Sequence, residues 1–414
     1  MGRRFERCVI AGVVRVWRGR QKPTHANTRV PPGSAWRGGT TATGEETMRF
    51  ISKVSPLADA VAAAAKIINT KGVIPILANV MIIAEEDVVI VRSTDLETTY
   101  ERRVPAAVTE AGRTTLQAHV FSKYLSQLEG EDLTLDATLG TPNAFLGCGK
   151  SRVELPTMTA EEYPELPTGE REMLRSMDGK YLARALDSVI FCAATDGGAQ
   201  VQGLRLDIGE DGLKTTATDG YRLARHDGGL VGDMTSLVMT ATSAKMLARG
   251  FQQSPQVTLS LLGADDNHLV VDDGGVKIHV RLVAKAYPDL DRAIGTPGAH
   301  TIVAPREELR LALKRSAMLA DTNTRSVLVS VNGNGVGLHV ESQTYGIGQE
   351  GILVQNDGAE LELHANATYL AQILEQIETD NVVINLADQA GTPIHISPDE
   401  PDAREHYVLM PLRG

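Results

Sequence analysis

Internal repetition limits the possible folds of this chain more than any other feature. The segment Tyr163–Leu166 reads Tyr-Pro-Glu-Leu, and Tyr287–Leu290 repeats it as Tyr-Pro-Asp-Leu 124 residues later. The pair Thr94–Asp95 recurs as Thr218–Asp219 at the same offset. Two landmarks that share one spacing indicate a duplicated domain rather than chance.

A third, fainter copy follows the first two. Each copy contains two Ala- and Leu-rich stretches with apolar residues at helical spacing, separated by short alternating β-branched runs. The first stretch begins at Leu57, Leu182 and Leu309, and the second at Leu125, Leu247 and Leu370. This pattern predicts an α+β protein of three tandem similar domains, each with two helices on an antiparallel sheet, over residues 48–170, 171–297 and 298–414.

Residues 1–47 differ from the rest of the chain, with nine Lys or Arg residues and three acidic ones. We expect an extension outside the fold, either a disordered tail or a start assigned upstream of Met48; an Arg-rich transit peptide is the alternative. Because the whole chain carries −11, residues 48–414 carry −17. Three cysteines and the absence of a long apolar run favour a reducing, cytoplasmic location without membrane contact and argue against a zinc site.

Two patterns in the sequence resemble catalytic motifs. Residues 144–151 match a relaxed phosphate-binding loop, but the residues that follow alternate and end at Pro156, which predicts a strand where that loop needs a helix. Asp95 and Asp219 occupy equivalent repeat positions, which is typical of turn residues rather than of a catalytic pair. The sequence therefore predicts a protein that is not an enzyme and needs no metal or cofactor.

Positive charge is concentrated on the predicted helices. The six helices carry ten basic and seven acidic residues in a protein that is otherwise strongly acidic. Such a basic helical surface on an acidic protein suits contact with phosphate groups without base recognition.

Four segments resemble the bacterial DNA polymerase III sliding clamp (beta subunit) family: residues 217–224, Tyr287–Asp289 with Arg292, Tyr407–Arg413 and Ile74–Leu77. The resemblance extends over residues 48–414. It implies a head-to-tail homodimer whose six similar domains form a ring around duplex DNA. It also implies that the replicative polymerase, the clamp loader, repair polymerases and ligase dock through short peptide motifs, which confers processivity.

The resemblance also implies the residues of each surface. The peptide-binding cleft would be lined by Val201, Thr218, Gly220, Tyr221, Arg222, Leu223, Pro288, Arg292, Asn366, Tyr369, Val408, Met410, Pro411, Leu412 and Arg413. Lys71 corresponds to a DNA-contacting position of the family, and the helical charges add Arg184, Lys245, Arg249, Arg310 and Lys314. The dimer interface would contain Val153 and Leu155 on one edge and Met318 and Leu319 on the other.

Two other functions stay open at this point. One is a clamp paralogue with altered partners, such as a resistance variant. The other is an enzyme that acts on a phosphorylated ligand through the Asp95 and Asp219 loops or through residues 144–151.

Overall fold

The computed structural model describes residues 47–68, 74–138, 142–194, 202–263, 267–285, 287–389 and 391–413. All of these belong to one compact unit, Glu45–Gly414. The expected basic extension lies outside the described residues except for Thr47.

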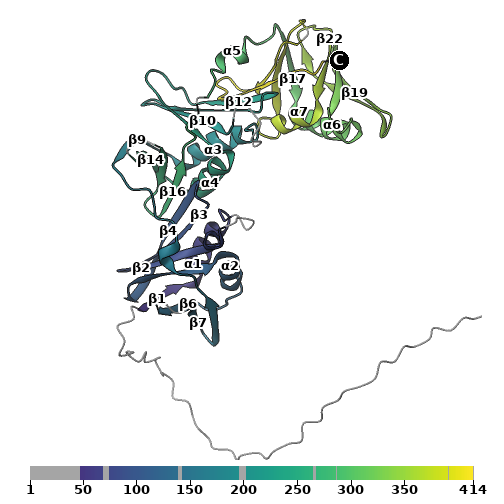
Figure 1. The fold of residues 1–414 in the computed structure, drawn as a ribbon. Coiled ribbons are helices and arrows are strands. Elements are labelled where there is room, and N and C mark those ends of the chain that lie inside the picture. The colour runs from purple at the N-terminus through teal and green to yellow at the C-terminus, as the bar shows by residue number, and fades with distance from the viewer. Residues whose placement is uncertain are drawn as a thin grey trace, which may run out of the picture. The chain divides into compact units, whose positions relative to one another are not determined.

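Three pairs of contacting helices correspond to the three repeats (Figure 1). The pairs are α1 (Val54–Ala65) with α2 (Ala118–Leu125), α3 (Gly179–Ile190) with α4 (Ala241–Phe251), and α6 (Arg306–Leu319) with α7 (Ala367–Leu374). Side chains at the preceding residue cap three of them: Asp178 before α3, Thr240 before α4 and Asn366 before α7. The buried faces hold leucine and alanine at helical spacing, as the sequence predicts.

The first repeat contains eight antiparallel strands. They are β1 (Thr47–Lys53), β2 (Asn79–Glu85), β3 (Val88–Thr94), β4 (Thr98–Glu110), β5 (Gly112–Gln117), β6 (Asp132–Thr138), β7 (Asn143–Cys148) and β8 (Ser151–Pro156), with short 3-10 turns at Pro75–Ala78 and Ala160–Glu162. Residues 144–151 thus form the β7–β8 hairpin, and no helix follows them. This geometry removes the basis for a phosphate-binding loop.

The second repeat divides its strands between two sheets. One set is β9 (Arg171–Met177), β14 (Val257–Leu262), β15 (His268–Asp272) and β16 (Val276–Arg281); the other is β10 (Leu204–Ile208), β11 (Leu213–Thr218), β12 (Arg222–Asp227) and β13 (Thr235–Met239).

The third repeat follows the short helix α5 (Asp291–Ile294). Its first set is β17 (His300–Pro305), β21 (Gln355–Asn356), β23 (Asn381–Leu386), β24 (Ile394–Pro398) and β25 (Glu405–Leu409). Its second is β18 (Ser326–Asn332), β19 (Gly335–Ser342), β20 (Gly346–Leu353) and β22 (Leu361–Asn366). The predicted fold class, tandem α+β repeats, is confirmed.

Successive repeats are joined edge to edge by antiparallel strand pairs. Strand β4 of the first repeat pairs with β16 of the second, and β12 of the second pairs with β25 of the third. As a result, one sheet has twelve strands and another has nine. Strand β8 ends the first of these sheets, and β20 ends the four-stranded sheet of the third repeat.

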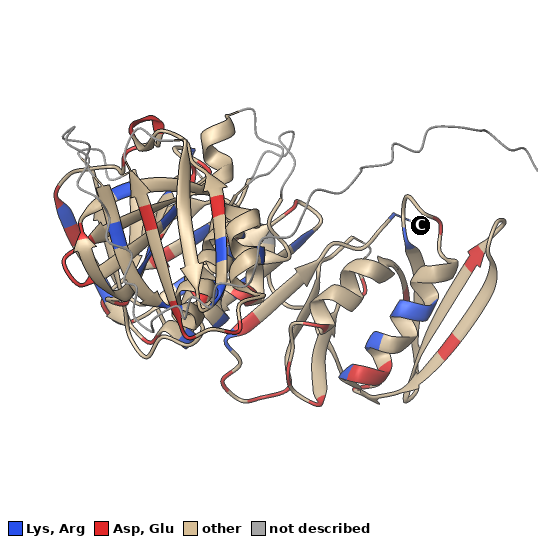
Figure 2. Cartoon of the chain, turned by 90° about the horizontal axis from the view of Figure 1, so that it is seen from below, with Lys and Arg blue, Asp and Glu red and all other residues tan. Residues whose placement is uncertain are grey.

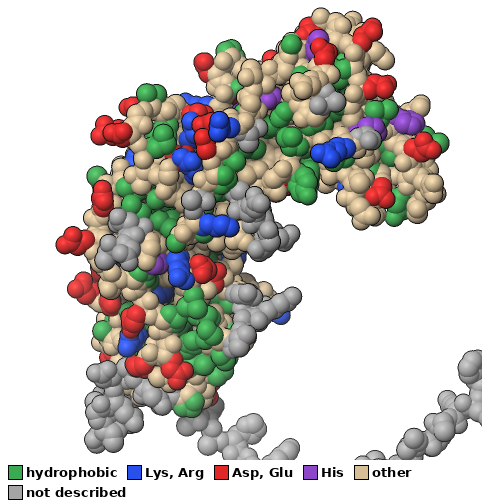
Figure 3. Space-filling view, turned by 45° about the horizontal axis from the view of Figure 1, so that its top comes forward, with side chains coloured by type: hydrophobic (Ala, Val, Ile, Leu, Met, Phe, Trp, Pro, Cys, Tyr) green, Lys and Arg blue, Asp and Glu red, His purple; other side chains and the backbone are tan. Residues whose placement is uncertain are grey.

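A continuous aliphatic core lies between the helices and the sheets. Cys148 and Cys192 are buried free thiols. The face drawn in Figure 3 carries hydrophobic, basic and acidic side chains intermixed. Within the described ranges no helix is long and apolar enough to cross a membrane, and no group of three potential ligand side chains could hold a metal ion.

Candidate functional site

The joint between the second and third repeats brings together most of the residues expected in the peptide cleft. The turn from β11 to β12 shapes its rim: the Asp219 carboxylate accepts the backbone N–H groups of Tyr221 and Arg222, each at 3.0 Å. Gly220 has φ of +89°, a conformation that favours glycine. Asp95 accepts two backbone N–H groups in the same way, so both aspartates are turn residues, as predicted.

The floor of this joint is apolar. Leu223, Ile294 and Val408 are buried against one another, and Leu290 packs on them. The chain beyond β25 borders this floor: the Met410 N–H donates to the Tyr221 carbonyl at 2.9 Å. The Met410 side chain is 39% exposed.

Arg222 links the two repeats from a buried position. Its Nε lies 3.0 Å from Asp219, and its Nη2 donates to the Phe191 carbonyl at 2.9 Å. Its Nη1 donates to Gln372 on α7, and the guanidinium stacks 4.2 Å from the centroid of the Tyr369 ring. The side chain therefore connects the turn between β11 and β12 to α7, and its expected place in the peptide cleft stays a prediction.

The other expected cleft residues are distributed around this joint. Tyr221 is 63% exposed, with its ring 6.4 Å from that of Tyr369. Asn366 caps α7 through the Tyr369 N–H. The structure further describes Thr218 as buried, Pro288, Arg292 and Arg413 as exposed, and Pro411 and Leu412 as half-buried, with the Leu412 N–H bonded to the His364 carbonyl; Val201 lies outside the described residues.

Sequence reasoning missed four residues of this joint: Leu290, Ile294, Phe191 and Gln372. Leu290 could have been found, because it closes the repeated Tyr-Pro-Asp-Leu motif. The other three reach the joint through contacts between segments far apart in the chain, for which the sequence carries no local signal.

Most of the expected DNA-contacting residues already have acidic partners. Arg184 pairs with Glu378 and Glu405, Arg310 with Glu307 and Glu375, and Lys314 with Glu375. Figure 2 shows basic and acidic residues interspersed on the helices and strands. Lys245 and Arg249 on α4 are exposed and form no ion pair with another described residue, whereas Lys71 lies outside the described residues.

The expected dimer residues lie on the two terminal strands or beside them. Val153 and Leu155 belong to β8, where both pack against the core. Met318, at the end of α6, is 72% exposed. Leu319 contacts the position where a Cβ on Gly348 of β20 would lie.

Each joint between repeats buries a carboxylate between an arginine and a histidine. At the first, Glu101 lies 2.7 Å from Arg92 and 3.8 Å from His279 across the joint. Burial opposes ionisation, but His279 and Arg92 outweigh it and lower the pKa of Glu101 to about 2. At the second, His226 and Arg184 lower the pKa of Glu405 to about 2.

Comparison with known proteins identifies the family. Residues 48–167 match the N-terminal domain of the DNA polymerase III beta subunit, and residues 292–413 match its C-terminal domain. The chain belongs to the DNA polymerase III beta subunit family. A beta sliding clamp from Caulobacter vibrioides is 26% identical over 377 residues, covering 88% of this chain and all of the relative.

Solved beta subunits have the same fold. The Thermotoga maritima structure superposes with a TM-score of 0.81 at 26% identity, covering 89% of this chain and 100% of that chain. A Caulobacter crescentus clamp, with polyethylene glycol bound to its putative beta-motif tethering region, has a TM-score of 0.79 at 25% identity over the same shares. The predicted family and its role, a DNA sliding clamp without catalytic activity, are confirmed. Neither comparison favours the paralogue or the enzyme acting on a phosphorylated ligand.

Proposed function

We propose that two copies of this chain close head to tail into a ring around duplex DNA, with β20 of one copy pairing with β8 of the other. The observation that carries this proposal is the repeated joint. Strands β4 and β12 each use their free edge to pair with the last strand of the following repeat, β16 and β25. In the third repeat, β20 corresponds to β4 and β12. In the first repeat, β8 corresponds to β16 and β25.

The residues that pair at the two joints within the chain predict which residues would pair between copies. Tyr100 lies opposite Ile278 at the first joint, and Ala224 lies opposite Tyr407 at the second. In the sequence, Gly348 stands three residues after Tyr345 as Ala224 stands three residues after Tyr221, and Val153 follows Arg152 on β8 as Ile278 follows Lys277 on β16. We therefore expect Gly348 to pair with the partner's Val153.

Packing at Gly348 supports this register. A Cβ there would lie 2.6 Å from the Leu319 side chain, so Leu319 occupies the space that a larger residue would fill. Beside it, the partner's Val153 would pack against Leu319. A large and a small residue face each other at the Ala224–Tyr407 joint in the same manner.

The assembly is tested by mass in solution. The parent chain should have the mass of a dimer at micromolar concentrations, and Val153→Asp should have the mass of one chain, because a charge at the joint would be desolvated without a partner. Phe145→Asp, on an exposed position of the neighbouring strand, is the matched control and should stay dimeric. A single-chain mass for the parent protein would contradict the ring.

Within such a ring, basic side chains on the helices would contact phosphates without regard to sequence, and topology would retain the DNA while individual contacts stay weak. Lys245 and Arg249 are the strongest candidates, because they are exposed and, although both lie near Asp187, neither forms an ion pair with a described residue. The protein loaded onto circular DNA should resist moderate salt and leave linear DNA by its ends. Equal loss from both would refute encirclement. Duplex DNA as the partner favours the cytoplasm as the location.

We further propose that the apolar joint of Leu223, Ile294 and Val408 binds short peptides containing Gln, Leu and Phe from the polymerase, loader, repair polymerases and ligase. Burying such a side chain contributes about 1.5–3 kcal/mol. Met410→Ala should weaken binding of a labelled peptide, measured by fluorescence anisotropy. Met173→Ala, at another exposed methionine, is the control and should bind like the parent. Equal affinity for all three proteins would count against this cleft.

A further inference from the structure

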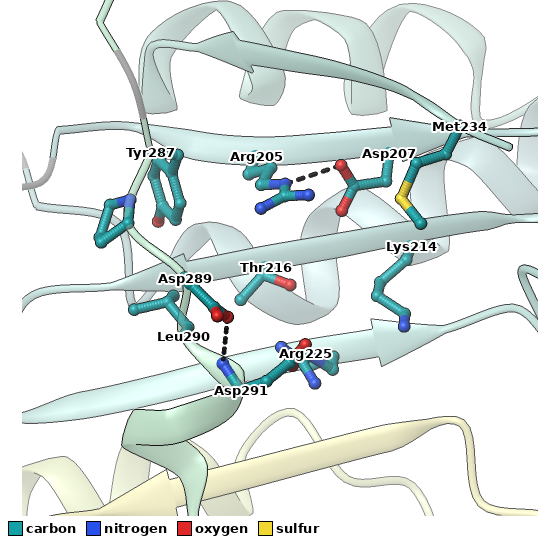
Figure 4. A pocket seen from close by; sticks show the side chains of 11 residues that line it. Arg205, Asp207, Lys214, Thr216, Arg225, Met234, Tyr287, Asp289, Leu290 and Asp291 are labelled. Atoms are coloured by element: carbon teal, nitrogen blue, oxygen red, sulfur yellow. Dashed lines mark hydrogen bonds and ion pairs between the residues drawn. The ribbon is translucent and has the colours of Figure 1, made fainter.

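The residues Tyr287–Ile294, here called the strap, connect the second and third repeats and run over the outer face of β10, β11 and β12 (Figure 4). Between strap and sheet lies a cavity of about 70 Å³. Its lining is largely polar and includes Arg205, Thr216 and Arg225 from the sheet and Asp289 and Asp291 from the strap. The strap therefore does not rest on a packed apolar surface along this stretch.

Two polar contacts hold the strap to the second repeat. At one end the Tyr287 hydroxyl donates to the Gly203 carbonyl at 3.4 Å. At the other end Arg225 Nη2 on β12 lies 2.7 Å from Asp291 Oδ1. Figure 4 shows the Arg225 and Asp291 side chains together at the base of α5.

The remaining charges of the cavity floor have partners within the sheet. Arg205 pairs with Asp207 at 2.7 Å, and Lys214 pairs with Asp227 at 3.0 Å. Among the described residues, Asp291 is the acidic partner of Arg225. On the other side of Arg225, the neighbouring strand β25 presents His406 directly opposite, and His406 in turn contacts His395 at 3.0 Å.

The first repeat holds its equivalent segment differently. Met81 and Ile83 stand 124 residues before Arg205 and Asp207, and Met81 is buried with Tyr163 and Ala160 in an apolar cluster against which Ile83 packs. Arg113 of the first repeat also pairs with Glu161 and Glu165 of this segment, at 3.4 Å and 3.7 Å, so ion pairs hold both segments and the apolar cluster is added in the first. Over the polar cavity floor of the second repeat, the Arg225–Asp291 pair connects the strap to β12.

The strap also forms part of the candidate cleft. Leu290 and Ile294, on either side of Asp291 and Arg292, pack against Leu223 and Val408. We propose that Arg225 is a positioning residue for peptide binding: through Asp291 it fixes the strap, and the strap fixes the Leu290 and Ile294 wall of the cleft. This inference rests on the proposed peptide-binding function and identifies the residue that maintains the cleft's shape.

Peptide affinity of the full-length protein tests the proposal. Because Asp291 is largely exposed, the ion pair is partly screened, and we expect Arg225→Gln and Asp291→Asn each to weaken binding about three- to five-fold. The double variant should bind no more weakly than either single one, since both remove the same contact. The reversed pair, Arg225→Asp with Asp291→Arg, should recover most of the affinity. Lys277→Gln breaks an ion pair with Asp272 at 3.0 Å, away from the strap, and should have no effect.

Salt dependence separates positioning from general loss of structure. With an uncharged Gln-, Leu- and Phe-containing peptide, parent affinity should fall as salt screens the Arg225–Asp291 pair, and Arg225→Gln should lose this dependence at an unchanged melting temperature. Parent-like affinity of Arg225→Gln, or no recovery in the reversed pair, would overturn the role of Arg225 and leave the cleft intact. Absence of binding by the parent protein would instead overturn the cleft, and this inference with it.

Discussion

Replacing Glu405 by glutamine should weaken the joint between β12 and β25 while preserving side-chain shape. The Glu405 side chain is 8% exposed and lies 3.1 Å from Arg184 and 3.6 Å from His226. These neighbours lower its pKa from 4.5 to about 2. One pKa unit corresponds to about 1.4 kcal/mol, which sets an upper value of about 3 kcal/mol for the stabilisation. Because Arg184 is 36% exposed, solvent screens part of this stabilisation. We therefore expect Glu405→Gln to lower the stability of the joint by about 2 kcal/mol.

The sign of the pH dependence follows from the direction of the shift. The folded-state pKa of Glu405 lies below its unfolded value, so the stabilisation is complete above pH 4.5 and is lost as the pH falls toward 2. The difference in stability between the parent protein and Glu405→Gln should be complete at neutral pH and less than half as large at about pH 3.

Hydrogen exchange measures this loss at the joint itself. Amides of β25, such as Tyr407, should exchange faster in Glu405→Gln, and those of β6, such as Leu135, should not. Glu101→Gln is the reciprocal control, since it should accelerate exchange in β4 and β16 alone. If the free energy of opening measured by exchange changed by less than about 0.5 kcal/mol at β25, or changed equally at β6, this account of the joint would be refuted.

Three further results are expected. Lys245→Gln with Arg249→Gln should reduce the slope of log affinity for DNA against log salt by about two, measured with short duplexes, because two phosphate contacts are lost. Deleting residues 410–414 should abolish peptide binding and leave the dimer mass unchanged, because the deletion removes one border of the cleft and none of the dimer edge. Gly220→Ala should lower the free energy of unfolding by about 1–2 kcal/mol in urea titrations, since φ is +89° at that turn.

Local patterns in the sequence predicted the local structure well. Helical leucine spacing predicted α3 and α6, and Asp219 predicted the turn between β11 and β12. Each of these features depends on residues within a few positions of one another. The internal offset of 124 residues then extended the local predictions to a tandem arrangement.

The electrostatic environment of the helices could not be predicted in this way. A census of helical charges treated Arg184, Arg310 and Lys314 as available to DNA. The structure pairs Arg184 with Glu378 and Glu405, which lie 194 and 221 residues away in the chain. It pairs Lys314 and Arg310 with Glu375, and Arg310 also with Glu307 three residues earlier. Arg222 is similarly drawn inward by Gln372, 150 residues away. Whether a surface charge is available therefore depends on long-range contacts that no local pattern encodes.

The joint between two copies should open more easily than the two joints within a chain. In the proposed register, Gln349 stands where Glu101 stands at the first joint, and Ser151 stands where Glu405 stands at the second. The carboxylate at this joint is Glu350, which pairs with Arg315 and is 27% exposed, so it is less buried than Glu101 and Glu405. Low concentrations of urea should reduce the mass in solution to that of one chain before hydrogen exchange becomes faster in β16 or β25. If the dimer mass were lost at the same urea concentration at which exchange rises in β16 and β25, this order would be contradicted. In the expected order, a ring opens for DNA at the joint between copies while the three repeats of each chain stay together.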